Sequence, residues 1–566
     1  MSPLVTSYVK SGLALALPVA FLVWRGLVRR QKSLGRAFVW WLGGLLGLTF
    51  AALAPIAIPE DTNRWAPFQL GREILRFSTL AIGVAFLIFV IAALLPVILD
   101  ALENRSFSSF VGARHVRATK SGFLTVISIL SMAGIGVSSC ALCSVTSIMG
   151  GFGHDLKRKI LNNNAHILVD STRPGGFGNW EDKLATIRTS IEAHGAKATP
   201  VVGGDAMGSS ASNTAGALVR GIDPETIGDV IDLEKNIEVG RFEYLTAPEK
   251  LAELPAEEII GRGPGGEPYF KGPDFKGGAA DDPALKEFLK RNIKILPGVI
   301  IGKELAKSLH VLVGDEVSLL SPMGELGPTG VIPRTRRFRV AAIFYSGMYE
   351  YDASHAYVLM EHAQKLFGME DKITNIDIRV PDAEKVKQIR PFVDQAIVGM
   401  EADGAKGAEI RARDWMEMNK NLFSALQLEK LATFIILSIA IAVASFCIVC
   451  TLLLMVTEKG KEIAILKALG ASNGAIMRTF MLEGVVLGGI GTLFGVGTAL
   501  AACTGLTWFG VRLDPDVYYI DRLPVNVNLG DYALVALASL VICTLATIYP
   551  AKTAADLSPV EGLRWE

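Results

Sequence analysis

The sequence lacks the motifs that mark an enzyme site. It contains no Gly-x-x-x-x-Gly-Lys-Ser/Thr stretch, so the chain does not carry the usual nucleotide site of a P-loop ATPase. Its 7 histidines are scattered, with no metal-ligand spacing among them. Because no group of residues can be given catalytic roles, we expect neither an enzyme site nor a metal or cofactor in this chain.

An excess of charge of one sign is also missing, and cysteine is scarce. The formal net charge is zero, so the bulk charge does not point towards nucleic acid. The 6 cysteines all lie inside apolar runs, which leaves none for a disulfide framework. Two pairs, at 140 and 143 and at 447 and 450, have the spacing of redox or metal sites. Thiols in lipid-facing helices lack the exposed, electropositive setting of a reactive thiolate, so we interpret them as small packing residues.

Long apolar runs dominate what is present. Half of the residues are apolar, which is too many for a purely soluble protein. Runs long enough to cross about 30 Å of hydrocarbon predict about seven membrane spans. They lie near residues 9–24, 38–58, 77–99, 123–149, 431–456, 480–508 and 532–549. We do not expect the first to be a signal peptide, because its basic cluster follows the apolar run.

The charges of the short loops predict the orientation of these spans. The first loop is basic and contains no acid, which places it in the cytoplasm and the N-terminus outside. Its basic residues are Arg25, Arg29, Arg30, Lys32 and Arg36. Alternation of sides then places the stretch 455–483 and the C-terminus in the cytoplasm. The long region between the fourth and fifth runs is predicted to be external.

This external region, about residues 150–430, alternates strand-like and helical patterns and predicts an α+β domain. Strand-like runs lie at 165–170, 217–224, 311–320 and 338–344, and helical runs at 181–194, 303–309 and 361–367. The segment 261–282 is dense in Gly and Pro and has few large apolar residues. It cannot bury enough surface to offset the chain entropy, so we expect a mobile insertion there.

The segment 321–333 joins two of the predicted strands and is expected to be a loop with exposed apolar residues. The apolar residues are Met323, Leu326, Val331 and Ile332, the prolines are Pro322, Pro328 and Pro333, and Arg334, Arg336 and Arg337 follow. One interpretation is an ordinary hairpin tip, since single exposed apolar residues are normal. The other is an anchor for a partner protein, because prolines reduce the entropy lost on docking.

The stretch 455–483 lies between two apolar runs and is too polar for a bilayer. Its apolar residues recur at helical spacing, which predicts a short amphipathic helix that ends at a glycine. Ser472 is expected to cap the helix that follows. The residues of this pattern are Glu458, Glu462, Ile463, Leu466, Leu469 and Gly470. Such a helix is well placed to receive a push from a soluble partner, although a solvated loop with some helix fits the spacing equally well.

The sequence of this stretch resembles a segment in the permease subunits of ABC transporters that act on lipoproteins or macrolides or that work in cell division. Those subunits carry E-x-x-x-E-I-A-I-L-[KR]-A-L-G-A-S, which residues 458–472 match. From about residue 110 onwards the chain is similar to the membrane subunits of the lipoprotein-releasing (Lol) system, of the LolC and LolE kind. The similar segments are 221–224, 297–306, 314–317, 322–324, 332–333, 347–350, 422–423, 429–430, 549–555, 559 and 561–564.

This resemblance implies a permease core made by the last four spans and a second permease subunit beside it. It also implies a separate ABC ATPase dimer that holds ATP and magnesium, a lipoprotein substrate in the inner membrane, and a periplasmic carrier like LolA. The coupling residues it implies are Glu458, Glu462, Ile463, Leu466, Leu469 and Gly470. The carrier-binding residues it implies, in a hook-like loop at 321–337, are Met323, Leu326, Pro328, Val331, Ile332, Pro333, Arg334 and Arg336.

The spans before residue 110 depart from the four-span core of the family. The expected layout is an additional N-terminal three-span segment (1–109), a first core span (110–149), the periplasmic domain (150–430), a second core span (431–456), a cytoplasmic coupling helix (457–479), the third and fourth core spans (480–550) and a cytoplasmic tail (551–566). The extra spans leave open whether the chain pairs as a homodimer or as a LolC/LolE-type heterodimer.

Two other functions fit the same resemblance. One is an efflux permease of the macrolide-exporter type, and the other is a division-type regulator of a periplasmic cell-wall hydrolase. A carrier protein as partner would favour lipoprotein release, whereas a coiled-coil adaptor or a hydrolase would favour the alternatives.

Overall fold

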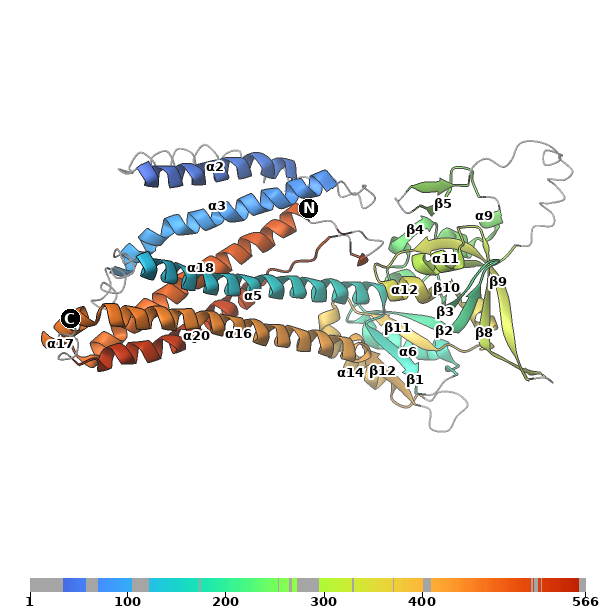
Figure 1. Ribbon diagram of the computed structural model, residues 1–566. Coiled ribbons are helices and arrows are strands. Elements are labelled where there is room, and N and C mark those ends of the chain that lie inside the picture. The colour runs from blue at the N-terminus through green and yellow to red at the C-terminus, as the bar shows by residue number, and fades with distance from the viewer. Residues whose placement is uncertain are drawn as a thin grey trace. The chain divides into compact units, whose positions relative to one another are not determined.

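Two units make up the chain in the computed structural model (Figure 1). The membrane unit comprises Met1–His154, Ser424–Asp514 and Asp521–Glu566. The second unit, called the sheet unit below, comprises Asp155–Phe423 and Pro515–Ile520. The structure describes residues 34–57, 70–103, 122–172, 175–252, 254–263, 267–271, 295–327, 330–369, 371–400, 409–510, 513, 518–520 and 522–558.

Long apolar helices form the membrane unit. They are α2 (Leu34–Ala57), α3 (Leu70–Glu103), α5 (Gly122–Asn163), α16 (Lys420–Glu458), α18 (Asn473–Phe509) and α20 (Leu529–Asp556), with the short α17 (Gly460–Ala468) between α16 and α18. Within the described part of the chain, 6 helices are long and apolar enough to cross a membrane. They coincide with the predicted runs from 38–58 onwards, and the predicted run 9–24 lies outside the described residues.

Small residues bring α18 close to α5 and α20. A Cβ atom at Gly495 would collide with the backbone oxygen of Gly136 on α5, and one at Gly484 would collide with Thr547 on α20. Hydroxyl pairs link α5 to its neighbours: Ser131 with Thr451 on α16 at 3.0 Å, Ser139 with Ser539 on α20 at 3.1 Å, and Ser147 with Tyr532 on α20 at 2.9 Å. Close approach and hydrogen bonds between helices are the contacts expected where lipid offers no hydrophobic drive for association.

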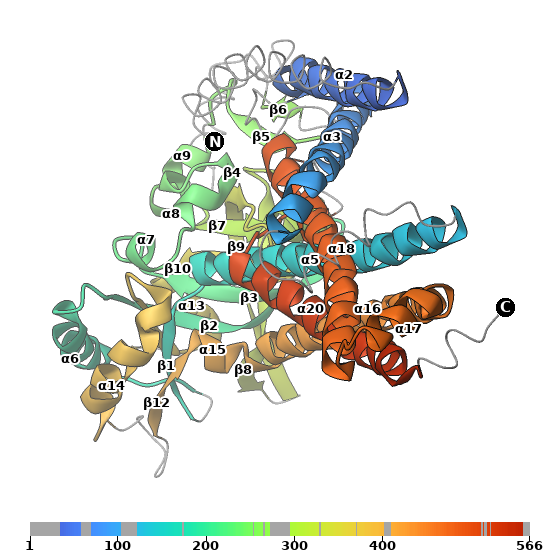
Figure 2. The ribbon, with the colours of Figure 1, turned by 90° about the vertical axis from the view of Figure 1, so that its left-hand side faces the viewer.

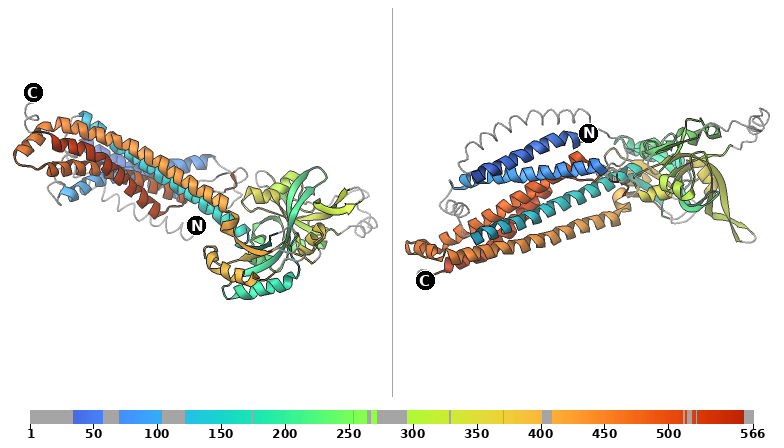
Figure 3. Two further views of the ribbon diagram at one scale, coloured as in Figure 1. Left: turned by 90° about the horizontal axis from the view of Figure 1, so that it is seen from below. Right: turned by 45° about the horizontal axis from the view of Figure 1, so that its top comes forward.

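The helices α2 and α3, which precede the predicted core spans, form an antiparallel pair (Figure 3). Aromatic rings fit against glycines along this pair: Phe89 against Gly43, Phe86 against Gly47, and Phe50 against Gly83. The pair docks on α18, where Leu80 lies over Gly505 and where Phe509 shares a buried cluster with Ala54 and Ala57. The helices α2 and α3 of the added N-terminal segment are therefore packed against the third helix of the predicted core.

A sheet of 10 strands forms the centre of the sheet unit. Its order is β12 (Ile410–Asp414), β1 (Ile167–Ser171), β11 (Asn375–Arg379), β2 (Lys197–Ser209), β3 (Thr214–Ile222), β10 (His355–Leu359), β7 (Gly298–Gly302), β9 (Gly330–Phe344) and β4 (Ile237–Gly240), while β8 (Glu316–Gly327) pairs with β2 and β9. Two neighbouring pairs, β10 with β3 and β7 with β9, are parallel. The Gly-Val-Ile-Ile-Gly sequence of β7 is buried throughout, as expected of a strand with neighbours on both sides.

Short helices cover this sheet. They are α6 (Trp180–Glu192), α7 (Ile227–Val230), α8 (Glu243–Thr246), α9 (Glu249–Ala252), α11 (Lys303–Leu309), α12 (Tyr349–Ser354), α13 (Met360–Phe367), α14 (Val386–Ile397) and α15 (Trp415–Met418), with 3-10 turns at Glu234–Asn236 and Ala383–Lys385. Figure 2 shows α6 and α14 together beside the strands β1 and β12. One large apolar cluster lies between the sheet and these helices.

The structure confirms the predicted α+β character and corrects one segment. The Gly/Pro-rich segment 261–282 was predicted to be a mobile insertion, but its start belongs to a two-stranded sheet of β5 (Ile259–Arg262) and β6 (Pro268–Phe270). Leu312 and Tyr269 pack around Gly261, so a few apolar contacts suffice to order the hairpin. Residues 264–266 and 272–282 lie outside the described residues.

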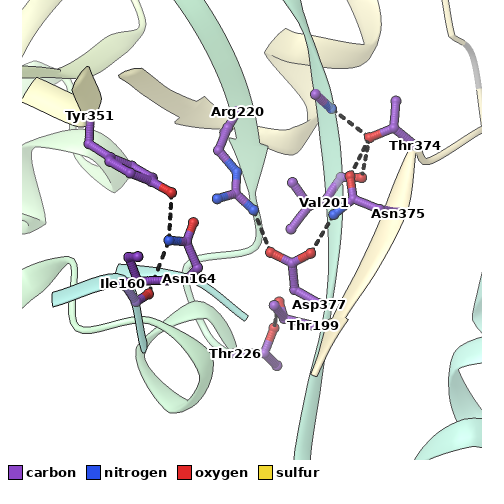
Figure 4. Close-up of polar contacts among 11 residues, drawn as sticks. Ile160, Asn164, Thr199, Val201, Arg220, Thr226, Tyr351, Thr374, Asn375 and Asp377 are labelled. Atoms are coloured by element: carbon purple, nitrogen blue, oxygen red, sulfur yellow. Dashed lines mark hydrogen bonds and ion pairs between the residues drawn. The ribbon is translucent and has the colours of Figure 1, made fainter. Parts of the chain in front are cut away.

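A buried ion pair crosses the sheet between β3 and β11 (Figure 4). The Arg220 guanidinium donates to one oxygen of Asp377, and the Asn375 amide donates to the other. Burial alone would lower the pKa of Arg220, but the Asp377 carboxylate more than offsets this, and the net shift is upward. The pair joins two strands that lie on either side of β2.

Candidate functional site

The stretch between α16 and α18 folds as helix, break and helix, which confirms the predicted pattern. α17 ends before Gly470, whose φ of 98° lies in the left-handed region that favours glycine. Ser472 then caps α18, because its hydroxyl accepts a hydrogen bond from the Ala475 backbone N–H at 3.3 Å. The letters Gly470-Ala-Ser472-Asn-Gly474 match the Gly-x-Ser-x-Gly motif of hydrolases. The serine here caps a helix and does not follow a strand, so it is not a nucleophile elbow.

One side of α17 is buried in the membrane unit. Ile463 is 3% exposed and packs in a cluster with Met455, Phe480 and Ala551, which come from α16, α18 and α20. The predicted apolar row of Ile463, Leu466 and Leu469 is therefore divided, because Ile463 is buried whereas Leu466 and Leu469 are exposed. Residues three positions apart on a helix point about 60° apart, so Ile463 and Leu469 point about 120° apart, and the packing of α16, α18 and α20 covers only Ile463.

The opposite side of α17 exposes apolar side chains. Leu469 is 81% exposed, and Leu466 and Ile465 are 41% and 49% exposed. Glu458 and Glu462 are also exposed, and Glu462 accepts from Lys459 at 2.5 Å. The sequence analysis did not include Ile465, because it considered only the apolar residues at i, i+3 and i+6 spacing. We call Ile465, Leu466 and Leu469 the outer face of α17.

Lys467 fixes α17 to the end of α20. Its Nζ donates to the carbonyl oxygens of Ala555 at 2.6 Å and Leu557 at 2.8 Å. These carbonyls belong to the last turn of α20 and the residue after it, where helix carbonyls lack intrahelical partners. Together with the buried Ile463, this contact connects α17 to both α18 and α20.

The segment 321–333 lies in a β-hairpin, as one of the two interpretations expected, but its described residues belong to the strands and not to a long loop. β8 and β9 pair as far as Gly327 and Gly330, with an irregularity between Ser321 and Glu325. A Cβ atom at Gly324 would collide with the backbone oxygen of Ile332, so this irregularity requires glycine. The prediction of a loop failed because prolines and glycines are typical of loops, whereas here the two strands pair with each other as far as Gly327 and Gly330.

The predicted carrier-binding residues are only partly described by the structure. Ile332 is 54% exposed, and Pro333 beside it is exposed. The side chains of Met323, Leu326 and Val331, and the whole of Pro328, lie outside the described residues. The Arg334 guanidinium lies against Gly368, and Arg336 is partly exposed. Burial, together with the nearby Arg336 and Lys365, lowers the pKa of His362.

Metal-binding groups do not occur in the described part of the chain: no three His, Cys, Asp or Glu residues are gathered in it as ligands. Arg220 and Asp377 pair with each other inside the sheet, where Asp377 is fully buried. The surfaces with a functional geometry are thus the outer face of α17 and the β8–β9 hairpin. Both expose apolar side chains to solvent in the described part of the chain, Leu469 on the first and Ile332 on the second.

Comparison with known proteins defines the class. Residues 434–559 match the family model "FtsX-like permease C-terminal", which covers α17 and its flanking spans. The chain is an ABC transporter permease, a multi-pass protein of the inner membrane.

The relatives define the family. The chain is 31% identical over 476 residues to the lipoprotein-releasing system transmembrane protein LolC of Neisseria meningitidis, covering 81% of this chain and 100% of that protein. It is 29% identical to LolC of Xylella fastidiosa, covering 81% of this chain and 98% of the relative. It is 28% identical to LolE of Haemophilus influenzae, covering 47% and 64%. The chain belongs to the family of LolC/LolE-type lipoprotein-releasing permeases.

Proposed function

We propose that this chain is the permease subunit of a transporter that extracts lipoproteins from the inner membrane and hands them to a periplasmic carrier. The observation that carries the proposal is the similarity to LolC proteins along their whole length. ATP hydrolysis, with its magnesium, belongs to a separate ATPase dimer. The sheet unit and the N-terminus lie in the periplasm in this proposal, and α17 and the C-terminus lie in the cytoplasm. The second permease subunit is another copy or a LolC/LolE-type partner.

The outer face of α17 is the proposed contact with the ATPase. The exposed Ile465 and Leu466 on this nine-residue helix, with Leu469 at its C-cap, form a compact apolar surface for burial against a partner. The buried side of the helix supports transmission. Ile463 packs on α18 and α20, and Lys467 holds the end of α20, so a displacement of α17 acts on both helices.

The β8–β9 hairpin is the proposed contact with the carrier. Its two strands make a stiff projection, and Ile332 provides an exposed apolar side chain near the tip. A carrier held close to the permease meets a physical requirement of the reaction. Each acyl CH₂ exposed to water costs about 0.8 kcal/mol, so release of lipid chains into water costs tens of kcal/mol. A shielded transfer avoids this cost.

Purification of the full chain with its bound proteins tests the proposal. We expect an ABC ATPase and lipoproteins in the preparation. Recovery of a coiled-coil adaptor or a cell-wall hydrolase in their place would contradict it.

Leu469→Asp tests the coupling surface. We expect normal abundance and membrane insertion but at least about tenfold lower ATP-driven transfer, since a charge replaces an apolar contact. Leu469→Met is the matched control and should retain transfer. Ile463→Asp should instead lower abundance, because it places a charge in a buried cluster. Full transfer by Leu469→Asp would remove the outer face of α17 from the mechanism.

A further inference from the structure

The loop between α18 and α20 carries a tyrosine that is packed into the sheet unit. The described residues 518–520 of this loop belong to that unit. The Tyr519 ring stacks on Tyr345 with a centroid distance of 5.7 Å and an interplanar angle of 13°. It also meets Tyr349 edge to face at 5.5 Å and 88°. Aromatic pairs with these geometries contribute more free energy of stabilisation than the burial of their apolar area alone.

The backbone of Tyr519 is held as well as its ring. Lys159 Nζ donates to the Tyr519 carbonyl oxygen at 2.9 Å and also pairs with Asp155 at 3.0 Å. Tyr519 has a φ of 56°, a left-handed conformation that is unusual for a bulky residue. Strained conformations of this kind persist where surrounding contacts hold them, and they gather at functional positions. The neighbouring Tyr518 is 61% exposed and provides a natural comparison.

The contact falls at the base of the β8–β9 hairpin. Tyr345 directly follows β9, the 15-residue strand whose other end, at Gly330, lies at the hairpin tip. At about 3.4 Å per residue, this strand extends about 50 Å from base to tip. Paired along its length with β8 and β7, it is a stiff connection. A shift at Tyr345 is therefore carried towards Ile332.

The end of α5 meets the same segment. Asn163 Nδ2 donates to the Ser346 carbonyl oxygen at 3.1 Å, and Asn164 Nδ2 donates to the Tyr351 hydroxyl at 2.7 Å (Figure 4). Ser346 in turn donates its backbone N–H to the buried Asp352 at 2.8 Å. Residues 345–352 thus join the end of β9 to the end of α5 and to the α18–α20 loop. We call them the junction segment.

We propose that Tyr519 is a positioning residue that latches the α18–α20 loop onto the junction segment, so that movement of the last two membrane helices reaches the hairpin. This adds a third connection to the covalent ones made by α5 and α16. What the hairpin then delivers rests on the proposed function, whereas the latch itself does not.

Hydrogen exchange of the purified full chain tests the latch without any substrate. Tyr519→Ala should raise the exchange rate of the amides in residues 345–352 by about tenfold, as expected from the loss of two aromatic pairs. Tyr519→Phe keeps both ring contacts and should retain protection. Tyr518→Ala, one residue away, should leave the junction segment unchanged. Unchanged exchange in Tyr519→Ala, or an equal increase in Tyr518→Ala, overturns the latch.

A transfer assay with the ATPase partner then tests the coupling role. Tyr519→Ala should retain ATP hydrolysis but lose transfer about tenfold, and Tyr519→Phe should restore it. A defect of folding alone would lower both activities together. Normal transfer by a Tyr519→Ala chain with a loosened junction segment overturns the coupling role. If the unaltered chain transfers no lipoprotein, the proposed function fails, and the exchange rates still decide whether Tyr519 is a latch.

Discussion

The contacts inside the sheet unit differ in kind from the contacts inside the membrane unit. The core of the sheet unit contains large apolar side chains, among them the fully buried Phe177, Phe338 and Phe344. The membrane unit is joined at glycines and at hydroxyl pairs, as where Gly495 meets Gly136. The hydrophobic effect of water drives the packing of apolar side chains in the sheet unit. In lipid, apolar helices gain no hydrophobic free energy by associating. Stability therefore depends on buried volume and paired charge in one unit and on close helix approach in the other.

Removal of a buried charge partner should have the largest effect. Asp377→Ala leaves the Arg220 guanidinium unpaired inside the sheet, and we expect the sheet unit to lose about 3–5 kcal/mol. Hydrogen exchange of β3 and β11 in the full chain measures this loss. The control is Arg411→Ala, which breaks the half-exposed pair with Asp170 and should cost no more than about 1 kcal/mol. Equal effects of the two variants would contradict the assignment of a buried, energetically distinct pair.

The buried Asp352 gives the sheet unit a pH dependence. The pKa of its carboxyl is raised from 3.8 to about 6, mainly by burial and with a smaller contribution from the nearby Glu304 and Glu238. A raised pKa means that the folded state binds the proton more tightly than the unfolded chain. The free energy of unfolding should therefore fall by about 3 kcal/mol as the pH rises from about 4 to about 6, because each pH unit between the two pKa values contributes about 1.4 kcal/mol.

Asp352→Asn should remove this pH dependence while it keeps an acceptor for the Ser346 N–H. Thermal unfolding of the full chain in detergent, followed at a series of pH values, measures the difference. A variant with the same pH profile as the unaltered chain would assign the dependence to other groups.

Added volume should be harmful at the helix contacts of the membrane unit. Gly495→Ala forces α18 away from Gly136, and we expect a loss of about 1–3 kcal/mol. Gly474→Ala on the same helix is the control, because nothing lies within 4 Å of its added methyl group. Resistance to unfolding in detergent compares the two variants. Equal stability would mean that α5 and α18 can separate without loss.

Loss of one hydroxyl pair should have the smallest effect. Ser539→Ala removes the contact with Ser139, and hydrogen bonds between membrane helices average about 0.6 kcal/mol. The same unfolding assay should show a change close to its limit of detection. A loss as large as that of Asp377→Ala would overturn the contrast between the two units.

The sequence predicted elements whose signals are local. The residues 303–309 were predicted to be helical and form α11 with the same bounds. The apolar runs from 38–58 onwards coincide with helices, and Gly470 and Ser472 have the predicted roles. These features depend on hydrophobic length, backbone preference and capping, which neighbouring residues determine.

Features that depend on distant residues were missed. The direction of Ile463 is set by helices α16, α18 and α20. Pairing of β8 with β2 and of β9 with β7 fixes the base of the hairpin in the sheet, and the pairing of β8 with β9 extends it through the proline-rich segment. Nothing near Tyr519 in sequence indicates that it stacks on Tyr345, which lies far earlier in the chain. Aromatic residues in short loops are common, so residue type alone carried no signal.

The hydrogen bonds from Lys467 to the end of α20 have a practical consequence for experiments on this transporter. The chain leaves its last described helix at Leu557, held beside α17. A bulky reporter or affinity tag inserted directly after Leu557 would thus begin next to the surface proposed to receive the ATPase. Fusions intended to measure turnover should use long, flexible spacers there, or place the label elsewhere.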